Sequence, residues 1–268
     1  MKIPVLTYHS TNISGNDYHN NDHIAFQADL ALILKNGIKV ISAKNLVEWL
    51  NGGLEIDSSH NYVVLTFDDG CELDYIDWQH PSYGPQKSFY SILKLYQKYV
   101  HATSFVIASA KVRRVLEQTC LAGNKIWGDG WWQDVEKSGL ISIENHSWDH
   151  LHTTLDNVQQ QDNRKGNFKL INSFADAQAQ IEQSSKFIDS IIKEKKTSLF
   201  AYPYGDYNSY LINEYFPNEQ REIQAAFSCD PEYVSETTNK WKIPRYVCGS
   251  HWCSPSELKN ILELKWRV

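Results

Sequence analysis

Hydrophobic and polar positions follow two alternating patterns along this chain. Short apolar runs rich in β-branched residues predict strands, and longer segments with apolar residues three or four positions apart predict helices. The predicted strands cover residues 4–9, 39–42, 62–70, 102–109, 140–146, 198–205, 227–229 and 242–248. The predicted helices cover residues 25–37, 43–53, 85–99, 131–139, 174–195 and 254–266.

This alternation of strand and helix predicts an α/β fold with parallel strands and crossover helices. Apolar strands of this kind are covered on both faces. We find no internal repeat, low-complexity tract or linker, so we expect one domain over residues 1–268. Polar motifs lie at the carboxyl ends of several predicted strands, at His9, Asp68–Asp69, His146, Tyr204 and Arg245. In a β/α barrel the carboxyl ends of the strands carry the active site.

Net charge and hydropathy limit the binding partners and the cellular location that we expect. The net charge of −6 argues against a nucleic acid or an anionic membrane as partner. No run of 18 apolar residues occurs, so we expect no transmembrane helix. The N-terminus lacks a signal-peptide pattern, and we expect a cytoplasmic protein unless a leader has been removed. The sequence leaves the oligomeric state open.

The sequence "TFDDG" delivers two aspartates at the end of a buried run. Successive strand residues point to opposite faces, so Asp68 and Asp69 can serve one site only where the chain turns, as Gly70 permits. Adjacent carboxylates repel and favour a cation or a shared proton. A solvated Asp-Gly turn is the alternative interpretation.

The stretch "NHSWDHLH" contains a second candidate feature. His146 and His150 are spaced i, i+4 and would face one side of a helical turn, whereas His152 would point elsewhere. Two histidines and a carboxylate with open positions form a hydrolytic metal site. Zinc is the first choice, and cobalt, nickel or iron suit the same ligands. The five cysteines contain no C-x-x-C pair, which argues against a thiolate zinc site.

The motifs "TFDDG", "HSWDH" and "YPYG", in this order, resemble the NodB-like polysaccharide deacetylases of carbohydrate esterase family 4. The resemblance extends from "PVLTYH" to "IPRY". It implies a distorted (β/α)7 barrel and metal-dependent hydrolysis of an N-acetyl group, or less often an O-acetyl group, on a sugar. It also implies that Asp68 is the general base, that Asp69, His146 and His150 bind the metal, and that the backbone N–H of Tyr204 stabilises the oxyanion.

Two departures from the common family pattern affect the remaining catalytic roles. Ala201 replaces the arginine that precedes the proline–tyrosine motif, and the early Tyr8–His9 and late Pro244–Arg245 resemble poly-N-acetylglucosamine deacetylases. We therefore infer that Arg245 restrains Asp68. The common C-terminal Leu-x-His is absent, so His9 is the expected acid and His251 its competitor.

Polar and aromatic residues in two loops are candidates for sugar binding, because flat aromatic faces suit sugar rings. The loops cover residues 70–84 and 123–132. The candidate substrate-binding residues are Trp127, Trp131, Asp74 and Asp129 in these loops, and Trp148 and His251 outside them.

The leading hypothesis is a metal-dependent deacetylase acting on an N-acetylated carbohydrate. One alternative is a hydrolase of another non-peptide C–N amide bond, which substrate profiling would reveal. A second is a catalytically silent carbohydrate-binding homologue, against which the intact Asp68, Asp69, His146 and His150 argue.

Overall fold

The computed structural model describes residues 1–121, 123–150, 166–193, 195–218 and 222–264. In this part of the chain the main sheet has eight strands, and its principal path runs β10-β1-β3-β6-β7-β8-β9, with β2 paired to β3. All pairings in this sheet are parallel, as predicted. The main strands are Val5–His9 (β1), Lys39–Ile41 (β2), Tyr62–Asp68 (β3), Ala102–Val106 (β6), Ile141–Asn145 (β7), Leu199–Ala201 (β8), Ala225–Phe227 (β9) and Tyr246–Val247 (β10).

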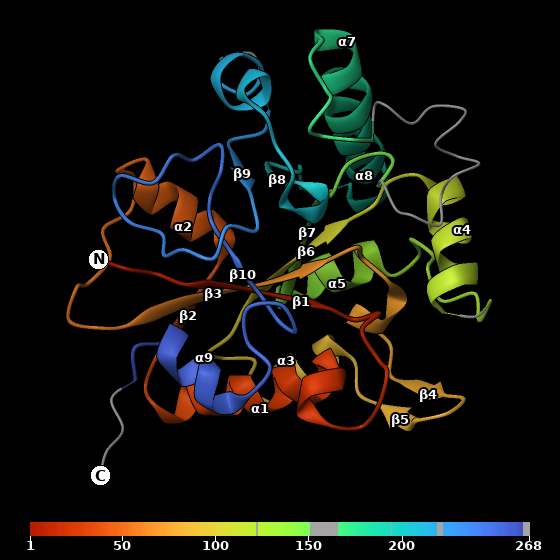
Figure 1. The fold of residues 1–268 in the computed structure, drawn as a ribbon, viewed down its shortest axis with the longest axis vertical. Helices are drawn as coiled ribbons and strands as arrows, with labels where there is room; N and C mark the ends of the chain where they lie inside the picture. Colours follow the sequence, from red (N-terminus) through yellow and green to blue (C-terminus); the bar gives the residue numbers. More distant parts are fainter. Residues whose placement is uncertain (122, 151–165, 194, 219–221, 265–268) are drawn as a thin grey trace.

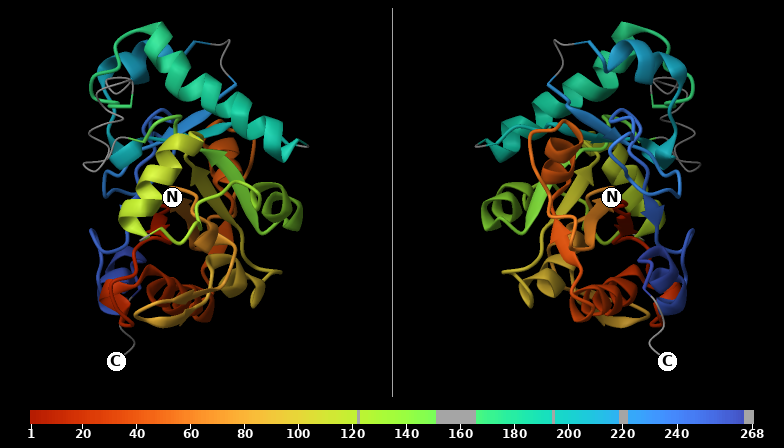
Figure 2. Two further views of the ribbon diagram at one scale, coloured as in Figure 1. Left: turned by 90° about the vertical axis from the view of Figure 1, so that its right-hand side faces the viewer. Right: turned by 90° about the vertical axis from the view of Figure 1, so that its left-hand side faces the viewer.

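Helices cover the outside of this sheet (Figures 1 and 2). In Figure 1, α1, α3 and α9 lie on one side, and α7 and α8 lie on the opposite side. The helices are Asp22–Lys35 (α1), Ala43–Leu50 (α2), Phe89–Lys94 (α3), Ala110–Cys120 (α4), Trp132–Ser138 (α5), Phe174–Ala177 (α7), Gln183–Ile192 (α8) and Pro255–Ile261 (α9). Short elements complete the fold: Tyr18–Asn20 (η1), Glu72–Asp74 (η2), Gln178–Glu182 (η4), Pro203–Gly205 (η5), Leu211–Tyr215 (η6), and the antiparallel pair Trp78–His80 (β4) and Gly84–Gln86 (β5).

Most predicted elements are present, and the differences have local causes. The predicted helix 174–195 is one helical stretch whose middle is the π-helical η4. The predicted helix 85–99 contracts to α3, which begins after Ser88 because the Ser88 side chain accepts the Ser91 N–H. Helix α4 was not predicted, although the Ser109 side chain caps it in the same way. The Ser254 side chain accepts the Glu257 N–H at the start of α9.

The sheet curls into a distorted β/α barrel, as predicted. Its open side, between β9 and β10, is bridged by a parallel contact between Phe227 and Ile243. Alternate residues of β3 therefore face two different cores. Val63, Leu65 and Phe67 belong to the cluster under the outer helices, whereas Tyr62 and Val64 belong to the cluster inside the barrel.

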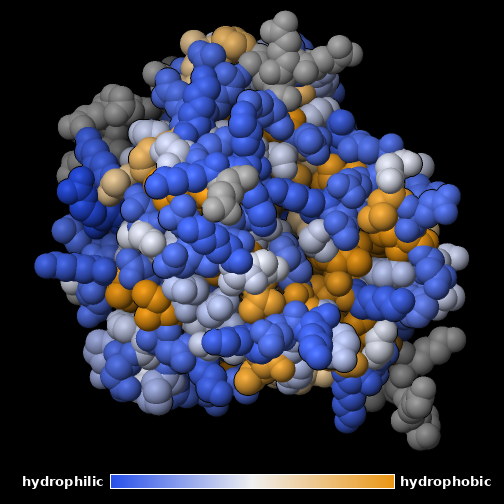
Figure 3. Space-filling view, turned by 180° about the vertical axis from the view of Figure 1, so that it is seen from behind, coloured by the Kyte–Doolittle hydropathy of each residue, from blue (hydrophilic) through white to orange (hydrophobic). Residues whose placement is uncertain are grey.

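The face opposite Figure 1 is mostly hydrophilic, with apolar groups between the polar ones (Figure 3). Among the described residues, no helix has the length and hydropathy needed to span a bilayer. The large apolar side chains exposed in this part of the chain are Ile76, Leu95, Tyr99, Leu170, Phe174 and Tyr204.

Candidate active site

Asp68 is the last residue of β3 and points into the barrel. It continues the inward-facing series of that strand, and the residue is 2% exposed. Arg245, fully buried just before β10, donates from Nη1 to Oδ1 of Asp68 at 2.7 Å and from Nη2 to Oδ2 at 2.8 Å. Its Nε also donates to the Ser228 carbonyl at 2.9 Å. The predicted contact between Arg245 and Asp68 is confirmed.

This bidentate pair fixes the charge of Asp68. Burial by itself raises the pKa of the Asp68 carboxyl, but the Arg245 guanidinium together with His146 and His9 outweighs burial and holds that pKa well below its usual range. The paired guanidinium has a correspondingly raised pKa. Asp68 is therefore an ionised, oriented hydrogen-bond acceptor throughout the neutral pH range.

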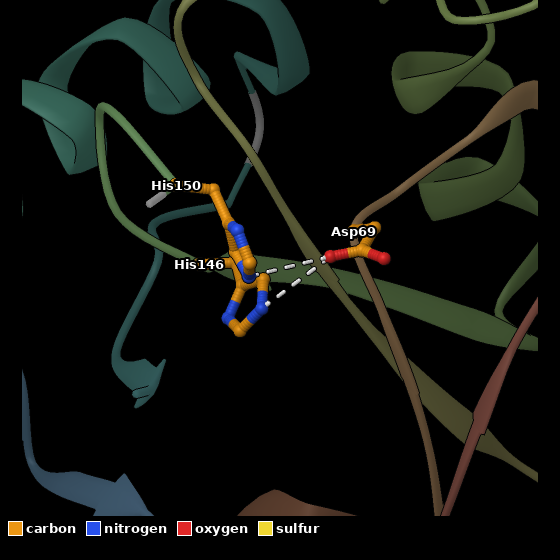
Figure 4. A group of neighbouring side chains, drawn as sticks. All are labelled: Asp69, His146 and His150. Carbon is orange, nitrogen blue, oxygen red and sulfur yellow. Dashed lines mark ion pairs between the residues drawn. The ribbon is translucent and has the colours of Figure 1, made fainter. Parts of the chain in front are cut away.

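Asp69, His146 and His150 form a cluster whose donor atoms converge (Figure 4). Oδ1 of Asp69 lies 3.7 Å from Nε2 of His146 and 3.7 Å from Nε2 of His150. One donor atom from each residue lies within 4.8 Å of the others. Two ligands of a tetrahedral zinc ion lie roughly 3.3 Å apart, given bonds of about 2.0 Å. A small inward shift therefore fits this O/N/N set to one divalent ion.

The hydrogen bonding of His146 suits it as a ligand. Its Nδ1 faces the Ala201 carbonyl at 2.9 Å, so Nδ1 carries the proton and Nε2 keeps its lone pair toward Asp69. Burial lowers the pKa of His146 to about 4 in spite of the nearby Asp68 carboxylate. The ring is therefore neutral near pH 7, as metal binding requires.

Left-handed backbone brings these side chains together. Asp69 (φ 74°), Ser147 (φ 75°) and Tyr204 (φ 57°) are non-glycine residues with positive φ, and they directly follow β3, the β7–His146 segment and Pro203. Each such residue costs on the order of 1 kcal/mol. Strain of this kind concentrates at functional sites. The turn at Asp69 lets two adjacent aspartates face one site, as the Asp-Asp-Gly motif predicted.

The predicted helical turn between His146 and His150 is wrong. Residues 146–150 contain a bend at Trp148–Asp149 and no helical hydrogen bonding, and the left-handed Ser147 turns the chain so that both rings face Asp69. Their ring centroids are 5.0 Å apart. His152 lies outside the described residues.

His9 and His251 both line the cavity at this site, and their surroundings differ. His9 is paired in register with Asp68 on the adjacent strand, and Asp22, Asp68 and Asp74 all interact with it electrostatically. The Nδ1 of His251 instead accepts the Val247 N–H at 2.8 Å, and burial lowers the pKa of His251. Protonation of His251 at Nδ1 would break that bond.

The cavity has a volume of about 540 Å³ and brings together residues from most strand ends. Trp127 and Tyr204 line it with the acidic and histidine residues. The Tyr204 side chain is 54% exposed and its ring lies 4.9 Å from the His150 ring. Burial and the nearby Asp69 raise the pKa of Tyr204 to about 12, so its hydroxyl stays protonated.

Four residues predicted to bind substrate do not line this cavity. Trp131 is 4% exposed and donates its indole N–H to the Gly128 carbonyl. Trp148 packs on Phe187 beside a separate depression. Asp74 is buried against Ser104, with its pKa raised by burial to about 7, and Asp129 pairs with Arg113. These four residues were predicted from their polar or aromatic character, which does not determine where a side chain points.

Sequence reasoning also missed residues that do line the cavity. Cys229 lies there with its Sγ 3.5 Å from Nη2 of Arg245, and Thr11, Asn12 and Cys120 line other parts. Cys229 closes the predicted strand 227–229, so the same rule about strand ends would have found it. Cys120 ends the unpredicted helix α4, and no sequence signal pointed to it.

Comparisons with known proteins agree with this geometry. The family model of polysaccharide deacetylases matches residues 55–217. A search of curated protein sequences finds no match. Similar solved structures include a Streptococcus pyogenes deacetylase in complex with acetate (TM-score 0.66, 18% identity, covering 98% of each chain). IcaB from Ammonifex degensii has a TM-score of 0.65 at 15% identity, covering 98% of this chain and 96% of that one.

A de-N-acetylase from Aggregatibacter actinomycetemcomitans is similar to the same degree, with a TM-score of 0.63 and 18% identity over 97% of this chain and 100% of that one. At these identities the structures establish the shared fold. The family model spans the residues that carry Asp68, Asp69, His146, His150 and Tyr204. This chain therefore belongs to the polysaccharide deacetylase family.

Proposed function

We propose that this protein is a metal-dependent hydrolase that removes an N-acetyl group from a carbohydrate. The observation that carries the proposal is the convergence of Asp69, His146 and His150 beside the ion pair of Asp68 and Arg245 in one cavity. A metal-binding triad next to an ionised, oriented carboxylate is the arrangement that hydrolysis of an acyl group needs. The proposed substrate is an N-acetylated sugar or polysaccharide.

Asp69, His146 and His150 would hold the ion. When bound, a divalent transition metal supplies Lewis-acid polarisation of the acyl carbonyl and acidifies water. The mixed oxygen and nitrogen donors suit zinc first, and cobalt, nickel or iron as well. Neutral His146, fixed by its bond to the Ala201 carbonyl, offers its Nε2 lone pair without first losing a proton.

Three further residues, Asp68, Tyr204 and His9, are proposed to transfer protons or to stabilise charge. Asp68, held by Arg245, accepts the proton of the attacking water. The backbone N–H of Tyr204 is proposed to donate to the developing oxyanion. His9 donates a proton to the leaving amine, because it lies beside Asp68 and among three carboxyl groups. An amine leaves poorly without protonation, so an acid in this position favours an N-acetyl substrate.

Metal removal tests the proposal directly. We expect chelator-stripped protein to release no acetate from N-acetylglucosamine oligomers and to regain activity when zinc is added. His150→Ala should lose zinc binding, whereas His60→Ala, in an exposed turn beside Asp57, should not. Metal and sugar binding without turnover would support a silent homologue instead. Hydrolysis that releases a product other than acetate would support action on another amide.

The assignment of the acid is tested by a pair of histidine variants. His9→Gln is expected to lower kcat by about 10²-fold or more, because general acid catalysis contributes about 10² to 10⁴-fold. His251→Gln should have the smaller effect, since the Nδ1 of His251 is committed to the Val247 amide. Rates of acetate release at saturating zinc provide the comparison. A larger loss in His251→Gln would reverse the assignment.

A further inference from the structure

The segment 126–128, in the loop between α4 and α5, is joined by hydrogen bonds to residues 69–72, which follow β3. One of these bonds runs from Nε1 of Trp127 to the Asp69 carbonyl at 3.2 Å. The others are Glu72 N–H to the Ile126 carbonyl at 3.0 Å, Cys71 Sγ to the same carbonyl at 3.1 Å, and Gly128 N–H to Oε1 of Glu72 at 2.7 Å. These hydrogen bonds therefore stabilise the turn that carries the proposed metal ligand Asp69.

The backbone at Asp69 needs such support. Its φ of 74° is left-handed, and that conformation directs the side chain toward His146 and His150. A Cβ atom at Gly70 would overlap the Val106 side chain, so the turn is also tightly packed. The Asp69 carbonyl accepts one backbone bond, from Ile107 N–H at 3.4 Å. The shorter bond from the Trp127 indole is therefore the stronger restraint on this carbonyl.

Arg113, on helix α4, anchors the other side of the segment. Its guanidinium is 2% exposed, donates to Oδ2 of Asp129 at 2.6 Å and to the Trp127 carbonyl at 3.3 Å, and lies 4.9 Å from the Trp132 ring centroid. A buried guanidinium is costly to move away from its partners. Arg113 thus fixes the backbone of Trp127 while the indole of Trp127 fixes Asp69.

We infer that Trp127 is a positioning residue for the metal ligand Asp69, and that Arg113 and Asp129 anchor it. Trp127 is 6% exposed and its N–H is engaged with the protein, so its ring offers a sugar little free face. The inference rests on the proposed metal site. It replaces the sequence-based role of Trp127 in sugar binding with control of metal affinity.

A matched pair of variants tests this inference. Trp127→Phe removes the indole N–H that reaches Asp69, and Trp131→Phe makes the same change in the same loop, where the indole reaches Gly128 instead. The dissociation constant for zinc, measured by chelator competition, should rise about tenfold or more in Trp127→Phe. It should rise less in Trp131→Phe, because that variant leaves the Trp127 indole on Asp69 and the Gly128 N–H on Glu72. The KM for substrate at saturating zinc should change little in either variant.

The outcomes separate this inference from the proposed function. Wild-type zinc affinity in Trp127→Phe, or an equal loss in both variants, would overturn the inference and leave the metal site standing. Failure of the wild-type protein to bind zinc or cobalt would overturn both. Asp129→Asn provides a second test, because its partly exposed side chain anchors the segment through Arg113 without reaching Asp69. It should weaken zinc binding in the same direction as Trp127→Phe.

Discussion

Asp68→Asn is expected to lower kcat for acetate release by about 10³-fold, within the range of about 10² to 10⁴ for general base catalysis. The amide has nearly the shape of the carboxylate but cannot accept the proton of the attacking water. Asp68 is not among the three proposed metal ligands, so zinc should still bind at one ion per chain when saturating. Single-turnover acetate release and metal analysis measure the two effects separately.

Asp68→Asn also leaves the buried Arg245 without its counterion. Breaking a buried ion pair by removing one partner costs about 3–5 kcal/mol, so this variant should be less stable as well as inactive. The double variant Asp68→Asn/Arg245→Met removes both charges and should recover part of that stability without recovering activity. Asp57→Asn, in an exposed turn, is the control for the substitution itself. A folded Asp68→Asn protein with wild-type turnover would disprove the base assignment.

Arg245→Met is expected to reduce the free energy of unfolding by about 3–5 kcal/mol at pH 7, because it leaves the ionised Asp68 buried and unpaired. Denaturant unfolding monitored by circular dichroism measures this loss. Arg114→Met, an exposed position next to the buried Arg113, should change stability by less than about 0.5 kcal/mol. An equal, small effect of both variants would contradict the inferred importance of the ion pair.

The pH dependence of this variant has a definite sign. In the wild-type protein the folded pKa of Asp68 lies below its unfolded value of about 3.9, so the pair's contribution is present above about pH 3.9 and is lost as the pH falls below it. Without Arg245, burial raises the pKa of Asp68, and the penalty for its charge is relieved as the pH falls. The stability difference between the two proteins should therefore be largest near pH 7 and narrow toward acid pH.

The catalytic consequence follows from the same shift. A raised pKa of Asp68 in Arg245→Met makes the base protonated over part of the working pH range, so the acidic limb of kcat/KM should move to higher pH. A purely structural role for Arg245 would lower the rate without moving that limb. The pH–rate profile of the folded variant distinguishes the two.

The sequence placed the principal site residues because of a general property of parallel sheets. Asp68, His146 and Tyr204 each follow an apolar run, and the carboxyl ends of parallel strands meet at one edge. Strand periodicity also gives Asp68 its direction, because it follows Val64 and Thr66 on the inward face of β3. Cys229 also lies at a strand end and lines the cavity, but the rule about strand ends was not applied to it.

Loop side chains were predicted less well, because no periodicity fixes their direction. Trp127 and Trp131 belong to one aromatic loop, yet one indole reaches Asp69 and the other reaches Gly128. Asp74 and Asp129 are polar loop residues, but each is held by a buried partner. Asp74 accepts a hydrogen bond from Ser104 on β6, and Asp129 accepts one from Arg113 on α4. Contacts with chain segments far away in sequence decide such orientations.

The sequence alone determined that this protein has a parallel α/β fold and that one end of its strands carries Asp68, Asp69, His146 and His150. It could do so because hydrophobic periodicity is a local property that shows where each strand ends. Only the tertiary structure decided that left-handed backbone at Asp69 and Ser147, rather than a helical turn, brings together the donor atoms of the three proposed metal ligands. It also decided that Arg245 pairs with Asp68, because residues so distant in the chain meet only when the barrel curls. Strained backbone and long-range ion pairs depend on packing from every side, which no local pattern records.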